Sequence, residues 1–163
     1  MATVNLHPNS TDSNQWTIVG GSGTVHQNLA DSDDTSLVRD NANGRTFEIS
    51  LDDYSAGGTI NSIRFYIRGV MFNARSGNTD IRVRISDSST TYYTEEVTLN
   101  FTSGYAPEDH YGTARTTYDG SNAWTDGILD GIKLNVATIE DPPGPAFAQI
   151  NKAYIEVTYT PAG

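Results

Sequence analysis

The sequence predicts an all-β protein, an antiparallel β-sandwich of jelly-roll type with at most one short helical turn. Three observations indicate this class. Apolar residues recur at every second position in several segments, which is the period of half-buried strands and not of helices. Segments rich in Gly, Asn, Asp and Ser separate these alternating runs. All six prolines lie outside the runs, as the hydrogen-bonded ladders of a sheet require.

Each predicted strand follows from its own alternation. The alternating apolar residues are, in chain order, Phe47, Ile49 and Leu51; Ile63, Phe65, Ile67 and Met71; Ile81, Val83 and Ile85; Val97, Leu99 and Phe101; Ile132, Leu134 and Val136; and Ile155, Val157 and Tyr159. Residues 41–44 (Asn-Ala-Asn-Gly) predict a hairpin loop, and residues 76–78 divide two further strands. About eight strands at this spacing are typical of a sandwich such as a jelly roll.

The length of 163 residues fits one domain. We expect residues 1–15 to form an extended N-terminal arm or a first strand, and residues 16–163 to form the sandwich. The arm is polar and weakly patterned, so we expect it to reach a neighbouring subunit. The N-terminus has neither the charged nor the apolar part of a signal peptide, and no apolar run approaches the length of a membrane span. Neither a signal peptide nor a membrane partner is therefore expected.

Residues 123–131 (Ala-Trp-Thr-Asp-Gly-Ile-Leu-Asp-Gly) predict one helical turn near the end of the sandwich. Thr125 is a suitable N-cap, and Gly131 ends the turn. The turn would direct Trp124, Ile128 and Leu129 to the same side. Trp124 is therefore predicted to be a plug over one end of the core, and an exposed binding platform is the alternative.

Composition excludes several classes of function. Ten basic against twenty acidic residues give a net charge of −10, which argues against a nucleic-acid partner. The chain has no cysteine, hence neither disulfides nor thiolate chemistry. His7, His26 and His110 are far apart in the sequence, and no Gly-x-Ser-x-Gly motif is present. We therefore assign no catalytic residue, cofactor or metal ligand and expect no enzymatic activity.

Acidic residues are candidates for other sites. Residues 31–34 and 52–53 contain the Asp-rich stretches that calcium sites often use, but a solvated turn is favoured and calcium stays open. A glycosidase pair of Glu95 or Glu96 with Glu156 would need two carboxylates facing each other. The alternation places Glu156 on the outer face, which suggests a surface ion pair instead.

Two surfaces are candidate contact sites. Arg64, Arg68, Arg82 and Arg84 are predicted on the outward faces of consecutive strands, either as a solvated, salt-bridged face or as a docking face for an acidic partner. The longest loops and their surroundings carry Tyr105, His110, Tyr111 and Tyr118, which would offer flat rings to a sugar.

The order of several short motifs resembles a family of small virion proteins of tailed bacteriophages and prophages. The motifs are Leu6-His7-Pro8-Asn9, Trp16, the turn from Asp31 to Asp34, Ala123-Trp124-Thr125, Leu129-Asp130, Gly131-Ile132, and the strand from Tyr154 to Tyr159. They cover nearly the whole chain. The resemblance implies a jelly-roll structural component of the particle.

From this resemblance we expect a capsid decoration (cement) protein that binds the outside of the shell and stabilises it. It would be located on the virion surface after assembly in the host cytoplasm, with the major capsid protein or other virion subunits as partners. It would form a homo-oligomer, for example a trimer. The alternative is a carbohydrate-binding module or a tail- or fibre-associated receptor-binding protein, with Trp16, Trp124 or the loop tyrosines as platforms. The exposure of these rings distinguishes the two.

Overall fold

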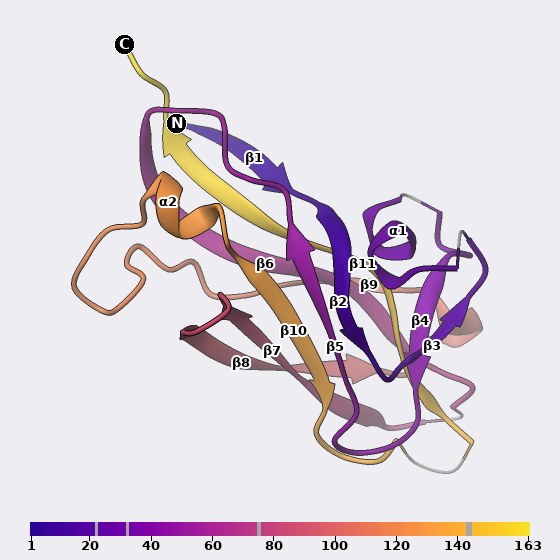
Figure 1. Ribbon diagram of the computed structural model, residues 1–163. Coiled ribbons are helices and arrows are strands. Elements are labelled where there is room, and N and C mark those ends of the chain that lie inside the picture. The colour runs from indigo at the N-terminus through magenta and orange to yellow at the C-terminus, as the bar shows by residue number, and fades with distance from the viewer. Residues whose placement is uncertain (22, 32, 75, 143–144) are drawn as a thin grey trace.

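The computed structural model describes residues 1–21, 23–31, 33–74, 76–142 and 145–163. The predicted class is confirmed, since the described chain is a sandwich of two antiparallel sheets (Figure 1). The elements are, in chain order, β1 (Ala2–Leu6), β2 (Pro8–Asn14), β3 (Thr17–Val19), α1 (Val25–Ala30), β4 (Leu37–Asp40), β5 (Thr46–Leu51), β6 (Thr59–Phe72), β7 (Asn78–Ser86), β8 (Thr91–Asn100), a 3₁₀ turn (Ser103–Tyr105), β9 (Glu108–Tyr111), α2 (Asp126–Leu129), β10 (Lys133–Thr138) and β11 (Phe147–Thr160).

The two sheets enclose one main core. The six-stranded sheet has the order β3-β4-β11-β6-β9, and β1 also pairs with β11. The five-stranded sheet has the order β2-β5-β10-β7-β8. Alternate side chains from both inner faces meet between the sheets, and the largest fully buried ones include Phe47, Phe65, Ile67, Ile81, Ile85 and Leu99. Most of the apolar residues that the alternation predicted to face inward form this core. Met71 lies in a separate small cluster, Tyr159 is only partly buried, and Phe101 is 36% exposed.

One predicted connection is different in the structure, and a second divides two strands as predicted but links the two sheets. Residues 41–44 do not close a hairpin, because β4 lies in the six-stranded sheet and β5 in the five-stranded one. The strands β6 and β7 also belong to different sheets. Turn residues show where the chain changes direction, but they do not show whether the next strand joins the same sheet. Because consecutive strands join different sheets, residues that are close in sequence lie on opposite outer faces of the sandwich.

The segment of residues 1–15 is built into the sandwich. β1 pairs with β11 of one sheet, and β2 pairs with β5 of the other. His7 lies between them, and Pro8 is the first residue of β2, where a missing amide hydrogen does least harm. Within its own chain the segment therefore follows the first-strand alternative, and a contact with a neighbouring subunit stays a prediction.

The predicted helical turn is α2. Thr125 precedes it as N-cap, and its hydroxyl oxygen accepts a hydrogen bond from the Ile128 amide at 3.3 Å. Trp124 is 3% exposed, and its indole nitrogen donates to the carbonyl oxygen of Arg115 at 2.9 Å. The other helix, α1, was not predicted. Neither helix in the described part of the chain has the length and apolar character needed to span a bilayer.

Candidate functional site

The outer face of the six-stranded sheet carries rows of aromatic and charged side chains. On β6 the inward residues Phe65 and Ile67 are fully buried, so Arg64, Tyr66 and Arg68 point outward. Arg64 and Tyr66 contact side chains from the strands on both sides, and Arg68 contacts side chains from β9 and from the segment before β4. The outer face therefore joins residues from β9, β6 and β11, which lie far apart in the sequence.

An aromatic row crosses the middle of this face, and we define it as Tyr111, Tyr66, Tyr154 and His7. The rings of Tyr66 and Tyr154 are stacked, with centroids 4.3 Å apart. Tyr111 lies 5.2 Å from Tyr66 on one side, and His7 lies 5.5 Å from Tyr154 on the other. Because the two central rings cover each other's faces, they offer little flat surface to a ligand. Tyr111, at the end of the row, is 48% exposed.

Charged residues lie on both sides of the aromatic row and are paired. The Arg64 guanidinium donates to Glu156 at 2.8 Å and lies 4.0 Å from the centroid of the Tyr111 ring.

On the other side of the row, Arg68 donates two hydrogen bonds to Asp34, both at 2.9 Å, and one to Asp109 at 3.0 Å. We call this arrangement the Asp34–Arg68–Asp109 clamp. The Tyr66 hydroxyl also donates to Asp109 at 2.6 Å, so the clamp is joined to the aromatic row.

The electrostatics of the clamp favour its ionised form. The hydrogen bonds from Arg68 lower the pKa of Asp34 below its ordinary value. The pKa of Asp109 is lowered first by the Tyr66 hydroxyl and then by Arg68. Burial raises the pKa of Tyr66, and burial with a hydrogen bond to Tyr111 raises the pKa of Tyr154 to about 12. At neutral pH the clamp therefore holds two carboxylates against one guanidinium beside neutral tyrosines.

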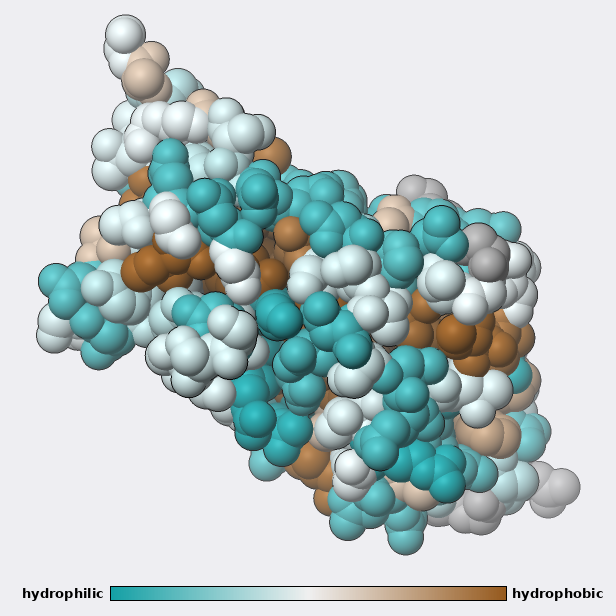
Figure 2. All heavy atoms as spheres, viewed as in Figure 1, coloured by the Kyte–Doolittle hydropathy of each residue, from teal (hydrophilic) through white to brown (hydrophobic). Residues whose placement is uncertain are grey.

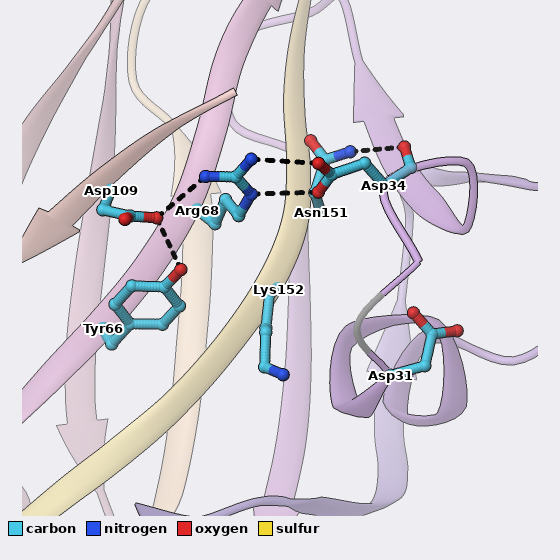
Figure 3. A pocket seen from close by; sticks show the side chains of 7 residues that line it. All are labelled: Asp31, Asp34, Tyr66, Arg68, Asp109, Asn151 and Lys152. Carbon is cyan, nitrogen blue, oxygen red and sulfur yellow. Dashed lines mark hydrogen bonds and ion pairs between the residues drawn. The ribbon is translucent and has the colours of Figure 1, made fainter. Parts of the chain in front are cut away.

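A hollow of about 300 Å³ opens next to the clamp (Figure 3). It is lined by Asp31, Asp34, Tyr66, Arg68, Asp109, Asn151 and Lys152.

A β-bulge in β11 shapes the hollow. The pairing between β11 and β6 shifts register between Ile150 and Lys152, so Asn151 is an extra residue in the ladder. The bulge allows the neighbouring Asn151 and Lys152 both to line the hollow, whereas regular alternation would place them on opposite faces.

The outer face of the five-stranded sheet has a different character. Arg82 and Arg84 point outward from β7, because Ile81, Val83 and Ile85 are fully buried. Neither arginine forms an ion pair within 4.0 Å with any described residue. The Nε atom of each is buried without a hydrogen-bond partner in the described chain. Figure 2 shows hydrophilic residues across the middle of the molecule where β5 and β10 lie in Figure 1.

The single four-arginine face predicted from the sequence is therefore wrong in its geometry. Arg64 and Arg68 lie on β6, and Arg82 and Arg84 lie on β7 of the other sheet. The prediction assumed that consecutive strands pair, but the chain crosses from one sheet to the other between them. The two pairs of arginines face away from each other.

The predicted aromatic surface is also divided. Tyr105 packs on Phe72, and Tyr118 packs on Trp124. His110 pairs in register with the buried Ile67, and its Nε2 is buried without a hydrogen-bond partner among the described residues. Of the four predicted residues, only Tyr111 belongs to the aromatic row, so Tyr105, His110, Tyr111 and Tyr118 form no common platform.

The two tryptophans are not on the surface. Trp16 and Trp124 are each 3% exposed. Trp16 makes an edge contact with Phe47, and its indole nitrogen donates to the Arg45 carbonyl oxygen at 3.1 Å. Both rings thus belong to the core, and although Trp124 lines a hollow beside α2, neither ring is exposed as a platform.

Several of the acidic residues that are candidates for calcium binding or catalysis have structural partners. Asp33 accepts hydrogen bonds from the amide and hydroxyl of Thr35, as expected for an acidic turn. Glu95 accepts from the Thr113 amide, and Glu156 pairs with Arg64 on the other sheet. No group of three or more His, Cys, Asp or Glu side chains suited to a metal ion occurs in the described ranges.

The hollow and its clamp were not predicted. Asp34, Asp109 and Asn151 come from three distant segments, and only the fold brings them together. One signal was present in the sequence, because the inward positions 148 and 150 are followed by 153, 155 and 157. This change of phase around Asn151 marks the bulge.

Comparisons with known proteins identify no family. No family model matches the chain, and no curated protein matches it. Among solved structures, the carbohydrate-binding module CBM36 in complex with calcium and xylotriose aligns with a TM-score of 0.46 and 13% sequence identity. The alignment covers 97% of this chain and 100% of that chain.

Proposed function

We propose that this protein is a non-enzymatic structural component of a tailed-phage virion, a decoration protein that attaches to the outside of the shell. The observation that carries the proposal is the pair Arg82 and Arg84 on the outer face of the five-stranded sheet. They lie two residues apart on β7, without an acidic partner within 4.0 Å in the described chain. The motif order described above supports the virion assignment.

The charge of the chain makes this pair unusual. Twenty acidic residues are present for ten basic ones, so acidic partners for surface arginines are abundant. Yet Glu96, the cross-strand neighbour of Arg82 in register, forms no ion pair with it in the described structure. Burial and the proximity of Arg84 lower the pKa of Arg82. An acidic partner surface would relieve this repulsion, and two guanidinium groups would give it planar, directional contacts.

A direct test is co-sedimentation of the purified protein with virions or empty shells of the phage that encodes it. We expect the protein to sediment with the shells and to dissociate as the salt concentration rises. The double variant Arg82→Gln/Arg84→Gln should bind at least about tenfold more weakly, because each close charge contact contributes on the order of 1 kcal/mol or more.

The matched control is Arg45→Gln/Arg64→Gln, which also changes the net charge from −10 to −12. Both of its arginines already have acidic partners, Asp40 and Glu156. The control should keep its affinity for shells. Failure of the wild-type protein to sediment with shells, or equal loss in both double variants, would contradict the proposal.

A second candidate function, saccharide binding, is favoured by a different observation. The hollow of about 300 Å³ on the six-stranded sheet is lined by polar side chains, and its Tyr66 adjoins the half-exposed Tyr111. The buried tryptophans do not contribute to it. Retention of the protein on insoluble polysaccharides, with release by free sugar, tests this function independently of shells.

A further inference from the structure

We propose that the hollow beside the Asp34–Arg68–Asp109 clamp binds one neutral, hydroxyl-rich sugar unit, an inference that rests on the second candidate function. The volume of about 300 Å³ is at the lower end of ligand pockets, so it suits one small ring and not an extended chain. The floor is formed by β6 and β11. The walls come from the segment that follows α1 and from β9 (Figure 3).

The lining specifies the chemistry of the ligand. All seven lining side chains carry a polar group, and no aliphatic side chain is among them. Three aspartates and two cationic residues give the hollow a net charge of −1 (2 − 3). This net negative charge would repel an anionic ligand such as phosphate or a uronic acid, because the cations of the hollow do not outnumber its carboxylates. A neutral polyol exchanges its hydrogen bonds with water for hydrogen bonds with the lining and loses little charge solvation.

The clamp leaves donors and acceptors next to each other. A guanidinium has five N–H groups, and the clamp uses three of those of Arg68. Oδ1 of Asp109 accepts from both Tyr66 and Arg68, whereas no hydrogen bond from a described residue to its Oδ2 is found. Remaining N–H groups and a carboxylate oxygen therefore lie on neighbouring side chains. Two adjacent sugar hydroxyls, each able to donate and accept, match this arrangement.

The geometry is fixed before a ligand arrives. The Asn151 amide donates to the carbonyl oxygen of Asp34 at 2.7 Å, which ties the loop to the bulge of β11. Gln149 in turn donates to the Asn151 side chain at 3.1 Å. Asn151 is 1% exposed, so its orientation is set by the protein and not by solvent. A rigid, hydrogen-bonded lining loses little conformational freedom on binding.

The experiment is an NMR titration of the full chain with the methyl glycosides of glucose, galactose, mannose and xylose. We expect at least one neutral glycoside to cause saturable shifts of the Asn151 side-chain amide and of the Arg68 Nε–H signal. Glucuronic acid should cause none. The variant Asp109→Asn, which keeps an oxygen for the Tyr66 hydroxyl but removes the charge, should weaken binding by about tenfold.

The matched control is Asp80→Asn on the outer face of the other sheet, where the carboxylate accepts a hydrogen bond from the Thr98 hydroxyl at 2.6 Å. It should bind as tightly as the wild type. If Asp109→Asn does not fold, Asp31→Asn serves in its place and should also weaken binding.

Three results would overturn the proposal: no neutral glycoside binds, the uronic acid binds equally well, or the control Asp80→Asn loses as much affinity as the variant in the hollow. Saccharide binding with shifts only at other residues would overturn this site while leaving saccharide binding as a function. The shell-binding assay is unaffected by any of these results, so the main proposed function stands or falls separately.

Discussion

The two outer faces of the sandwich each present two arginines on one strand, and they use them in opposite ways. On the six-stranded sheet, Arg64 and Arg68 are held by carboxylates from β11, β9 and the segment before β4. On the five-stranded sheet, Arg82 and Arg84 have no acidic partner within 4.0 Å in the described part of the chain. The difference lies in the neighbouring strands and loops, because β6 and β7 both alternate buried apolar residues with outward arginines.

Several acidic residues of the five-stranded sheet bind groups other than Arg82 and Arg84. Glu48 accepts from the Asn135 amide, Asp80 accepts from the Thr98 hydroxyl, and Asp12 bonds Ser50 and approaches Lys133. A paired arginine is part of the scaffold, and it orients the groups around it. An arginine without such a partner keeps its charge available for another molecule. The two faces therefore differ in their electrostatics: one ties its arginines to carboxylates, and the other leaves its two arginines without an ion pair among the described residues.

The largest expected effect concerns stability. Replacing Arg68 with Gln removes three charge-assisted hydrogen bonds and leaves Asp34 and Asp109 without their shared cation. We expect the free energy of unfolding to fall by about 1–2 kcal/mol, allowing for solvent screening of the half-exposed aspartates. Arg84→Gln should change it by less than about 0.5 kcal/mol. Urea denaturation of both variants measures this difference. Equal losses in the free energy of unfolding would show that the paired and the unpaired arginine contribute alike to stability.

This distinction was only partly predictable from the sequence. Two-residue alternation shows which side chains face outward, and it placed all four arginines outside. It does not show which sheet a strand joins, because that depends on packing between strands far apart in the chain. Arg68 and Arg82 therefore lie on different sheets, although they are only fourteen residues apart in the sequence (82 − 68). The sandwich itself was predictable because every strand has an apolar face to bury.

The clamp was less predictable than the sandwich. Asp34 looked like part of a solvated turn, and Asp109 like part of a loop, and each interpretation is locally reasonable. Their common partner appears only when β6 lies between β9 and β11. Asn151 carried a usable signal, since a polar residue that interrupts apolar alternation indicates a bulge. Such an interruption indicates where neighbouring side chains can point to the same face of a sheet and line a binding site.

A smaller effect should appear in acid. The lowered pKa values of Asp34 and Asp109 mean that the folded protein binds their protons less readily than the unfolded chain. This stability is present above the ordinary pKa of about 4 and is lost as the pH falls through the folded values. The difference between wild type and Arg68→Gln should therefore shrink as the pH decreases from 7 to about 3. Urea midpoints at several pH values test this, and a constant difference would show that the clamp is not electrostatic.

The smallest effect is expected in alkali, where the variant Tyr111→Phe should change a tyrosine pKa on the six-stranded face only. The pKa of Tyr154 is raised to about 12 by burial and by its hydrogen bond to Tyr111, so the folded protein keeps this proton longer than the unfolded chain. A raised pKa contributes stability that is lost as the pH rises from about 10 toward 12. Tyr111→Phe removes the hydrogen bond and should lower the pKa of Tyr154, whereas that of Tyr92, which bonds Asp87, should stay near 12.

Carbon-13 NMR of the tyrosine rings resolves these two titrations in one sample. Tyr92 lies beside Trp124 and away from the aromatic row, so it reports any general loosening of the fold. A downward shift of Tyr154 alone would show that the row is held by local contacts across β9, β6 and β11. An equal shift of the pKa values of Tyr154 and Tyr92 would mean that Tyr111 stabilises the whole sandwich. The contacts of the aromatic row would then not be local to the six-stranded face.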